Sequence, residues 1–276
     1  MIKGWRYYNH AIIPTTLPHQ EVDLAPVNDG SVWKINPNAI FARWTSEFDC
    51  QEETDWWYII KDGTYNVEDF SQHHKKHIRQ AMKKCYVKRI DASQMIDDVL
   101  RVHLEAIARY QNYDKNIDKE AFLKTVREAG NDVEWWGAFL VETDMLVGYM
   151  KIRIKEDIAD IAVSKFSSLY LNSRMSDALY HAVLEHYLNE RKLRYVNSGE
   201  KSISHTTNTQ DYKVGEFQYR KAYCKLNIAY NPKFKWIIKI MYPFRKPMGL
   251  FSKVSLVRNL LSVLKMEEIV RKQEKR

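Results

Sequence analysis

The chain has 276 residues, of which 45% are hydrophobic and 13% aromatic, and it contains only three cysteines. This composition excludes a disordered chain, and the length allows one large domain or two small ones. Three cysteines are too few for a disulfide framework or a cysteine-based zinc site, so we expect a cytoplasmic protein in a reducing compartment. No apolar run approaches the ~20 residues that span a bilayer.

The net charge of +8 is concentrated in the C-terminal segment. Residues 233–276 contain 12 basic and 3 acidic residues, a net charge of +9, so the rest of the chain sums to −1. This near-neutral body argues against a large nucleic-acid footprint, which needs a basic surface. The charge therefore indicates the C-terminal segment as the part of the molecule that docks on a partner. It says little about catalysis.

The first elements lie in residues 1–65, where we expect strands and loops. Three runs rich in β-branched or aromatic residues predict strands: VWKI, AIFARW and WWYII. Asp62 and Gly63 predict a turn after the third run. A helix is then expected after a cap at Asp69 or Ser71. It runs through HHKKHIRQAMKK, and YVKRI follows as a strand.

The middle of the chain predicts two helices and then three strands. Apolar residues at a spacing near 3.6 predict helices over residues 93–109 and 118–129. WWGAFLVE, LVGYMKIRI and ADIAVSKFSSLYL predict strands, and their short connections favour antiparallel pairing. A strong helix follows over residues 175–191, with Asn172 or Ser173 as its cap.

The last elements of the body alternate between strand and helix. RYVNSG predicts a short strand, TTNTQDYKVGEF a loop with a short helix, and YRKAYCKLNIAY a strand. The whole order predicts an α/β (α+β) fold with a mixed, mainly antiparallel sheet flanked by helices, not a repeated βαβ array. We expect three segments: a β-rich N-terminal extension (1–65), a core (66–232) and a basic amphipathic helical tail (233–276).

This order of elements resembles the GNAT (acyl-CoA N-acyltransferase) fold. It resembles more closely the divergent branch that contains the Fem-type peptidoglycan aminoacyltransferases. Four segments within about residues 70–230 carry the likeness: HHKKHIRQAMKKCYVKRI, LVGYMKIRI, LYLNSRMSDALYHAVLEH, and RYVNSGEKS with QDYKVGEFQYRKAY. The resemblance implies an enzyme that moves an acyl group from acetyl-CoA or another acyl-CoA to an amine. Fem-type enzymes use aminoacyl-tRNA instead, which is one alternative.

The third segment is similar to the strand-to-helix junction that holds the acyl donor in GNAT enzymes. The resemblance places donor binding at six residues: Leu171, Asn172, Ser173, Arg174, Met175 and Ser176. A helix N-terminus binds anions, and Arg174 can add positive charge. The junction has no glycine, whereas GNAT donor loops are usually glycine-rich, and Asp177 repels phosphate. This departure favours a second alternative, a non-catalytic GNAT-fold scaffold at the membrane surface.

Four residues are candidates for proton transfer in such a reaction. Glu200, which follows the strand RYVNSG, is a candidate base, and His205 in a polar loop is another. Tyr219 or Tyr223 can serve as the acid. The other interpretations stay open: a solvated carboxylate, a surface histidine and two tyrosines that serve packing.

His73 and His77 stand four residues apart on a predicted helix, a spacing compatible with a metal site. Lys75, Lys76 and Arg79 surround them and repel a cation. We therefore expect no metal, and the basic cluster either faces solvent or contacts an anionic ligand.

The C-terminal segment predicts a basic amphipathic helix over residues 251–265. Four apolar residues share its face: Val254, Val257, Leu261 and Leu264. Such a helix lies in an anionic membrane surface, or it packs on the body or on a second subunit.

The resemblance implies a transferase whose acceptor is a small-molecule amine or an amino sugar. The expected setting is cell-envelope or polysaccharide metabolism, in the cytoplasm or peripherally on the inner face of the membrane. An anionic membrane surface, reached through residues 233–276, is one candidate partner beside the protein surfaces named above. The sequence does not indicate an oligomeric state.

Overall fold

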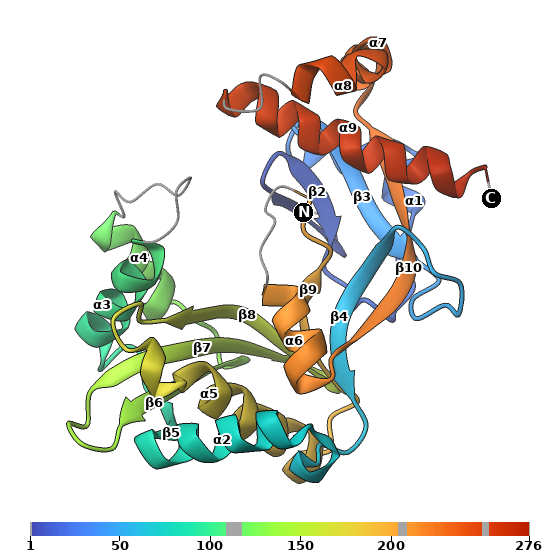
Figure 1. The fold of residues 1–276 in the computed structure, drawn as a ribbon. Coiled ribbons are helices and arrows are strands. Elements are labelled where there is room, and N and C mark those ends of the chain that lie inside the picture. Colours follow the sequence, from blue (N-terminus) through green and yellow to red (C-terminus); the bar gives the residue numbers. More distant parts are fainter. Residues whose placement is uncertain (1, 109–117, 204–208, 250–253, 276) are drawn as a thin grey trace. The chain divides into compact units, whose positions relative to one another are not determined.

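Figure 1 shows a computed structural model of the chain, which describes residues 2–108, 118–203, 209–249 and 254–275. The chain forms two compact units. Unit 1 consists of Met1–Tyr58, Glu200–Asn208 and Lys221–Arg276. Unit 2 consists of Ile59–Gly199 and Thr209–Arg220. The β-rich start of the chain and its basic tail thus share one unit, a division that differs from the three consecutive segments expected from the sequence.

Unit 2 is built on five strands in the order β9-β8-β7-β6-β5. Its elements in chain order are η2 (Val67–Asp69), α2 (Gln72–Lys84), β5 (Cys85–Ile90), α3 (Ile96–Ile107), α4 (Lys119–Arg127), β6 (Val133–Leu140), β7 (Leu146–Lys155), β8 (Ile158–Phe166), η3 (Leu171–Ser173), α5 (Met175–Leu184), η4 (Glu185–Glu190), β9 (Tyr195–Glu200) and α6 (Thr209–Phe217). β5 to β8 pair antiparallel, and β9 joins β8 in parallel. The predicted fold class, a mixed and mainly antiparallel sheet with flanking helices, is confirmed.

Two adjacent tryptophans of β6 show that helices cover both faces of this sheet. Successive side chains of a strand point to opposite faces. Trp135 packs in a cluster with Val99 and Val102 of α3. Trp136 donates its indole N–H to the Tyr187 hydroxyl in η4, at 2.9 Å. α3 therefore lies on one face, and the continuous helix of α5 and η4 lies on the other.

Helix starts follow the predicted capping chemistry in one case and depart from it in another. The Ser71 hydroxyl accepts the His74 backbone N–H at 3.1 Å, so the second of the two predicted caps of α2 is confirmed. The prediction of Asn172 or Ser173 as the cap of α5 is wrong. Arg174 is the residue before the helix, with φ of 57° and no side-chain cap. The Ser173 hydroxyl instead donates to the Tyr170 carbonyl at 2.7 Å.

Unit 1 contributes the strand order β1-β2-β3-β10-β4. Its elements are β1 (Trp5–Tyr8), β2 (Ala11–Pro14), α1 (Ala25–Asn28), η1 (Ser31–Lys34), β3 (Phe41–Ser46), β4 (Trp56–Asp62, which continues into unit 2), β10 (Arg220–Tyr230), α7 (Pro232–Met241), η5 (Tyr242–Phe244), α8 (Arg245–Met248) and α9 (Ser255–Gln273). The strand predicted at VWKI is wrong, because this run forms η1. Gly30 there has φ of 75°, and the Asp29 carboxylate accepts the Ser31 N–H. That is local turn chemistry, which a strand does not contain.

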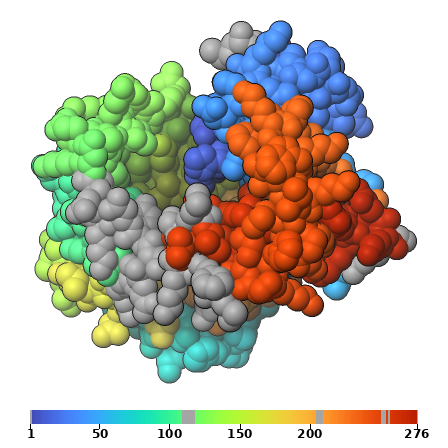
Figure 2. Space-filling model, turned by 90° about the horizontal axis from the view of Figure 1, so that it is seen from above, coloured from blue at the N-terminus to red at the C-terminus, as the bar shows by residue number. Residues whose placement is uncertain are grey.

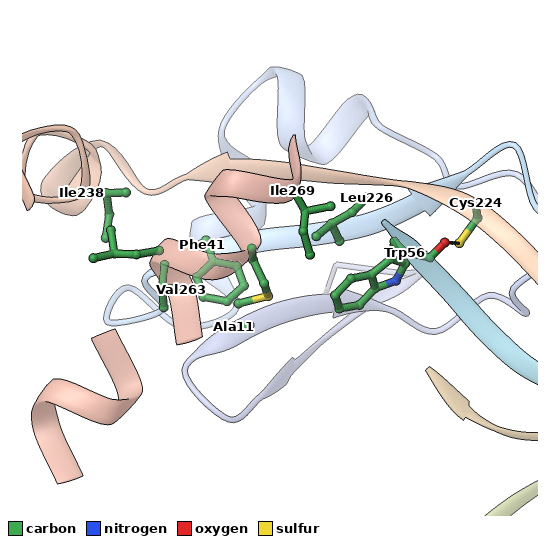
Figure 3. Packing of buried hydrophobic residues seen from close by; sticks show 10 residues of the cluster. Ala11, Phe41, Trp56, Cys224, Leu226, Ile238, Val263 and Ile269 are labelled. Atoms are coloured by element: carbon green, nitrogen blue, oxygen red, sulfur yellow. Dashed lines mark hydrogen bonds between the residues drawn. The ribbon is translucent and has the colours of Figure 1, made fainter. Parts of the chain in front are cut away.

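The C-terminal helix α9 packs its apolar face into the core of unit 1. Val263 and Ile269 lie against Phe41 of β3 and Leu226 of β10 (Figure 3). The helix extends beyond the predicted residue 265 because buried apolar residues continue its stripe. The Gln273 side chain bonds both the N–H and the carbonyl of Leu226, each at 3.1 Å. Of the two interpretations of the predicted tail helix, packing on the body describes α9.

Candidate active site

Strands β8 and β9 are paired only at their beginnings. Their parallel pairing ends where Asp160 lies opposite Asn197, although β8 continues to Phe166. The Asn197 amide donates to the Asp160 carboxylate at 2.9 Å and strengthens this end of the pair. Beyond it, within the described residues, the two strands no longer bond to each other. Side chains of α5 and α6 lie next to β9 in this region.

Lys213 of α6 is a buried cation in this region. Its side chain is 5% exposed, and its Nζ donates to the Ser198 hydroxyl of β9 at 2.5 Å. No ion pair to a carboxylate is found for it in the part of the chain that the structure describes. Burial lowers the pKa of Lys213 to about 8. The ammonium group therefore holds its proton at neutral pH but gives it up more easily than an exposed lysine does.

Two buried tyrosines lie close to this lysine. The ring centroids of Tyr180 and Tyr219 are 6.3 Å apart, and Lys213 Nζ lies 5.8 Å from the Tyr180 centroid. The Tyr219 hydroxyl has no hydrogen-bond partner among the described residues, whereas the Tyr180 hydroxyl lies near the hydroxyls of Ser164 and Ser198. Burial raises the pKa of Tyr180 to about 12 and raises that of Tyr219 well above its ordinary value. Both hydroxyls are therefore neutral hydrogen-bond donors. A ligand oxygen that accepts from a buried, unpaired hydroxyl binds favourably, because the hydroxyl no longer lacks a partner.

α6 positions these groups through its C-terminal end. Gln218 takes a left-handed conformation with φ of 53°, and the Tyr219 N–H then donates to the Lys213 carbonyl at 3.1 Å. Tyr219 is one of the predicted acids, and the structure brings it together with Lys213 and Tyr180. Its catalytic role stays a prediction.

The predicted donor-binding segment, residues 171–176, lies at the start of α5. Asp177 is 3% exposed, accepts a short hydrogen bond from the Tyr212 hydroxyl and lies 3.5 Å from Arg174 Nη1. The two opposite charges offset each other, so the remaining attraction for an anion comes mainly from backbone N–H groups.

Packing and hydrogen bonds already involve much of this segment. Met175 is buried near Gly148 of β7, where an added Cβ would lie 3.0 Å from the Met175 Cγ. The Asn172 carbonyl accepts from Lys84 Nζ at 2.9 Å, and Leu171 is exposed. The Ser176 hydroxyl lies 3.4 Å from the Tyr212 hydroxyl. Donor binding by these residues stays a prediction.

Glu200, a predicted base, belongs to unit 1. It accepts a short, charged hydrogen bond from Arg43 of β3, and both line a cavity of about 100 Å³. Leu17, Thr45 and Tyr58 are also in its wall. Burial raises the pKa of Tyr58, so its hydroxyl is neutral there.

The other two predicted proton-transfer residues lie elsewhere. Tyr223 is on β10 in unit 1, where its ring meets Trp57 edge-on at 6.2 Å and burial raises its pKa. His205 lies outside the described residues. Of the predicted catalytic residues, unit 1 thus holds Glu200 and Tyr223, and unit 2 holds Tyr219.

Sequence reasoning missed Lys213 and Tyr180. Both lie in segments that carry the family resemblance, Lys213 in QDYKVGEF and Tyr180 in the α5 stretch. Lysine is almost always a surface residue, and tyrosine on an apolar helix face normally serves packing.

A histidine cluster of unit 2 could hold a metal ion. Ligand atoms of His74, His77 and Glu216 all lie within 4.8 Å of one another, and His74 Nδ1 is 2.7 Å from Glu216. Burial lowers the pKa of both histidines, which favours the neutral form that binds metals. Arg174 also lowers the pKa of His77, and its positive charge opposes a cation. The His73–His77 spacing noted in the sequence gives a ring contact at 4.0 Å.

The sequence was compared with family models and curated proteins, and the structure with solved structures. No family model and no curated protein matches the sequence. FemX is similar with a TM-score of 0.55 and 7% identity, over 83% of this chain and 82% of that one. L-PGS from Bacillus licheniformis has a TM-score of 0.50 and 10% identity, over 95% and 84%.

The C-terminal domain of a protein named as a lysylphosphatidylglycerol synthetase, from Agrobacterium fabrum, also has a TM-score of 0.50 and 10% identity, over 81% and 79% of the two chains. At such identities the likeness concerns the fold alone. The expected resemblance is confirmed at that level: the chain has the GNAT-like fold, in the form that FemX and these two proteins share.

Proposed function

We propose that the chain is an N-acyltransferase that moves an acyl or aminoacyl group to an amine. One observation carries the proposal: Lys213 is buried without a carboxylate partner among the described residues, beside the unpaired hydroxyl of Tyr219 and the buried hydroxyl of Tyr180. Strongly perturbed groups that cluster in this way are typical of active sites. The GNAT-like fold supports the same reaction class.

The proposed reaction forms a bond between the amine nitrogen and the donor carbonyl carbon. It breaks the bond from that carbon to the sulfur or oxygen of the leaving group, and one proton passes from the amine to the leaving group. The Lys213 ammonium stabilises the negative charge that develops on the carbonyl oxygen. With a pKa of about 8, it can also give its proton to the leaving group and recover one from the amine. Tyr180 and Tyr219 add neutral hydrogen-bond donors.

Acyl-CoA is the first donor that we propose, bound at the start of α5 as the resemblance implies. A second candidate is aminoacyl-tRNA. It is favoured by the absence of glycine from residues 171–176 and by the offset charges of Arg174 and Asp177, which leave little to hold a pyrophosphate. One similar structure is named as the C-terminal domain of a lysylphosphatidylglycerol synthetase, and this name supports the second candidate. The acceptor that we propose is a small-molecule amine or an amino sugar of the cell envelope.

A two-arm transfer assay tests the proposal. The full chain is incubated with radiolabelled acetyl-CoA in one arm, and with alanyl-, glycyl- and lysyl-tRNA in the other, each with a panel of amines and amino sugars. We expect acceptor-dependent transfer in one arm and its loss in Lys213→Met. No transfer in either arm, or a Lys213→Met variant as active as the parent, contradicts the proposal and favours the non-catalytic scaffold.

A further inference from the structure

Helix α7 has two apolar faces, and only one of them is covered. Ile238 is 4% exposed and Met241 packs beside it in the core of unit 1. Trp236, Ile240 and Phe244 follow at intervals of four residues and are 60%, 55% and 55% exposed. At 100° per residue Trp236 and Ile240 form one stripe on the side of α7 away from Ile238, and η5 continues it. Figure 2 shows the segment that contains α7 in orange at the surface of unit 1.

The charge around this stripe has a single sign. Residues 232–254 contain six basic residues and no acidic one. Lys233, Lys235, Lys239 and Lys246 are exposed, and no ion pair is found for them within the described ranges. Lys233 and Lys239 lie on opposite flanks of the Trp236–Ile240 stripe. Arg245 is different, because Glu268 of α9 accepts from its Nε at 3.1 Å.

The neighbouring helix α9 cannot offer such a stripe. Its buried apolar residues, which include Val263, Leu264 and Ile269, pack in one cluster with residues of β3 and β10. The acids of the tail also lie on this helix, where Glu267 bonds Arg271 and Glu268 bonds Arg245. The sequence pattern suggested α9 as the docking element, whereas the exposed apolar surface belongs to α7 and η5. Among the described residues, no helix is both long and apolar enough to cross a membrane.

We propose that α7 and η5 form the docking face of this protein on an anionic phospholipid surface. Trp236, Ile240 and Phe244 enter the boundary between headgroups and acyl chains, and the four exposed lysines lie at the headgroup phosphates. An indole and long lysine side chains suit this boundary, because each has an apolar body and a polar tip. The absence of acids over 23 residues is complementary to anionic lipid. This proposal is independent of the transferase reaction.

Vesicle co-sedimentation of the full chain tests the proposal. We expect binding to vesicles of 30% phosphatidylglycerol in phosphatidylcholine, weak binding to pure phosphatidylcholine, and a decrease with rising salt. The triple variant Trp236→Ala/Ile240→Ala/Phe244→Ala should lose most of the binding. Replacing Lys233, Lys235, Lys239 and Lys246 with Gln should lower the partition constant by roughly 600-fold, since each of the four basic residues contributes about fivefold.

Matched substitutions in unit 2 serve as controls. Val141→Ala/Leu169→Ala/Leu104→Ala removes three exposed apolar side chains, and Lys76, Lys83, Lys119 and Lys124 changed to Gln removes four exposed charges. Both controls should bind vesicles as the parent does. All substituted side chains are exposed, and thermal melts confirm that the variants fold. A parent that ignores anionic vesicles, or an apolar triple variant that binds like the parent, overturns the proposal. If light scattering shows that the triple variant turns a dimer into a monomer and the parent does not bind vesicles, the face is a self-association surface instead.

Discussion

Units 1 and 2 each contain a charged side chain in their candidate site, Glu200 partly buried and Lys213 fully buried, and the two charges are compensated differently. In unit 1 the Glu200 carboxylate meets the Arg43 guanidinium. In unit 2 the Lys213 ammonium meets the neutral hydroxyl of Ser198, with Tyr180 nearby. A paired charge is stabilised in the ground state, whereas an uncompensated one gains most when a negative charge develops beside it. The comparison favours Lys213 over Glu200 as the reactive group.

Of the substitutions that test this comparison, Lys213→Met should have the largest effect on the transfer rate. Removing one preorganised donor of this kind lowers a transfer rate about 100- to 1,000-fold. Methionine fills a similar volume without charge, so the melting temperature should stay equal or rise. The rate is measured in whichever donor arm is active, beside a thermal melt. A variant that keeps its rate would remove the distinction between the two sites.

The pH dependence of stability tests the same burial without a substrate. Lys213 has a pKa of about 8 in the folded chain, below the ordinary 10.5 of a lysine in the unfolded chain. Between these values the unfolded state binds more protons at this lysine, so Lys213 by itself adds about 3 kcal/mol of stability as the pH goes from about 8 to 10.5. We expect urea denaturation to show a smaller rise in Lys213→Met. Parallel curves for the two proteins would mean that the lysine is hydrated in solution.

Arg43→Met tests the paired site. It leaves the Glu200 carboxylate partly buried without its guanidinium, and we expect a loss of about 1 to 3 kcal/mol in unfolding free energy at pH 7. Arg43→Lys is the control that keeps the charge. An Arg43→Met variant with parental stability would mean that the pair contributes nothing.

Glu200→Gln should have the smallest effect. The amide oxygen still accepts from Arg43, so we expect the transfer rate to stay within about tenfold, whereas loss of a general base lowers rates about 100-fold or more. The rate and its pH profile are measured together. A drop of more than 100-fold, with loss of the acidic limb of the profile, would restore Glu200 as the base and reverse the comparison.

The fold was predictable where residue periodicity was strong. β6 and β7 follow from dense apolar and aromatic runs joined by a short turn, and α2 follows from its serine cap. Left-handed backbone conformations at residues other than glycine were not predictable. Arg174 takes such a conformation, and the sequence has no glycine there to indicate it. VWKI has the composition of a strand, but the Asp29–Gly30 turn decides its conformation.

The candidate site was harder to predict because its properties depend on tertiary neighbours. Glu200 was a reasonable base until the fold brought Arg43 to it from 157 positions away. Lys213 resembles a solvated helix lysine in the sequence, and its burial results from the packing of α6 on β9 and α5. Charge compensation and burial of this kind are set by contacts between distant segments, which one sequence does not reveal.

The pairing of β3 with β10 has a consequence for the order in which the protein is synthesised. Phe41 of β3 lies opposite Tyr230 of β10. The helix that packs on both strands, α9, comes even later in the sequence. At common translation rates Tyr230 leaves the ribosome roughly 10 to 40 s after Phe41. During that time β3 has an unpaired edge, while most of unit 2 comes from one continuous stretch that can fold first. Unit 1 therefore completes its core last. In a chain that ends before α9, Phe41 and Leu226 would stay exposed to solvent and would promote aggregation.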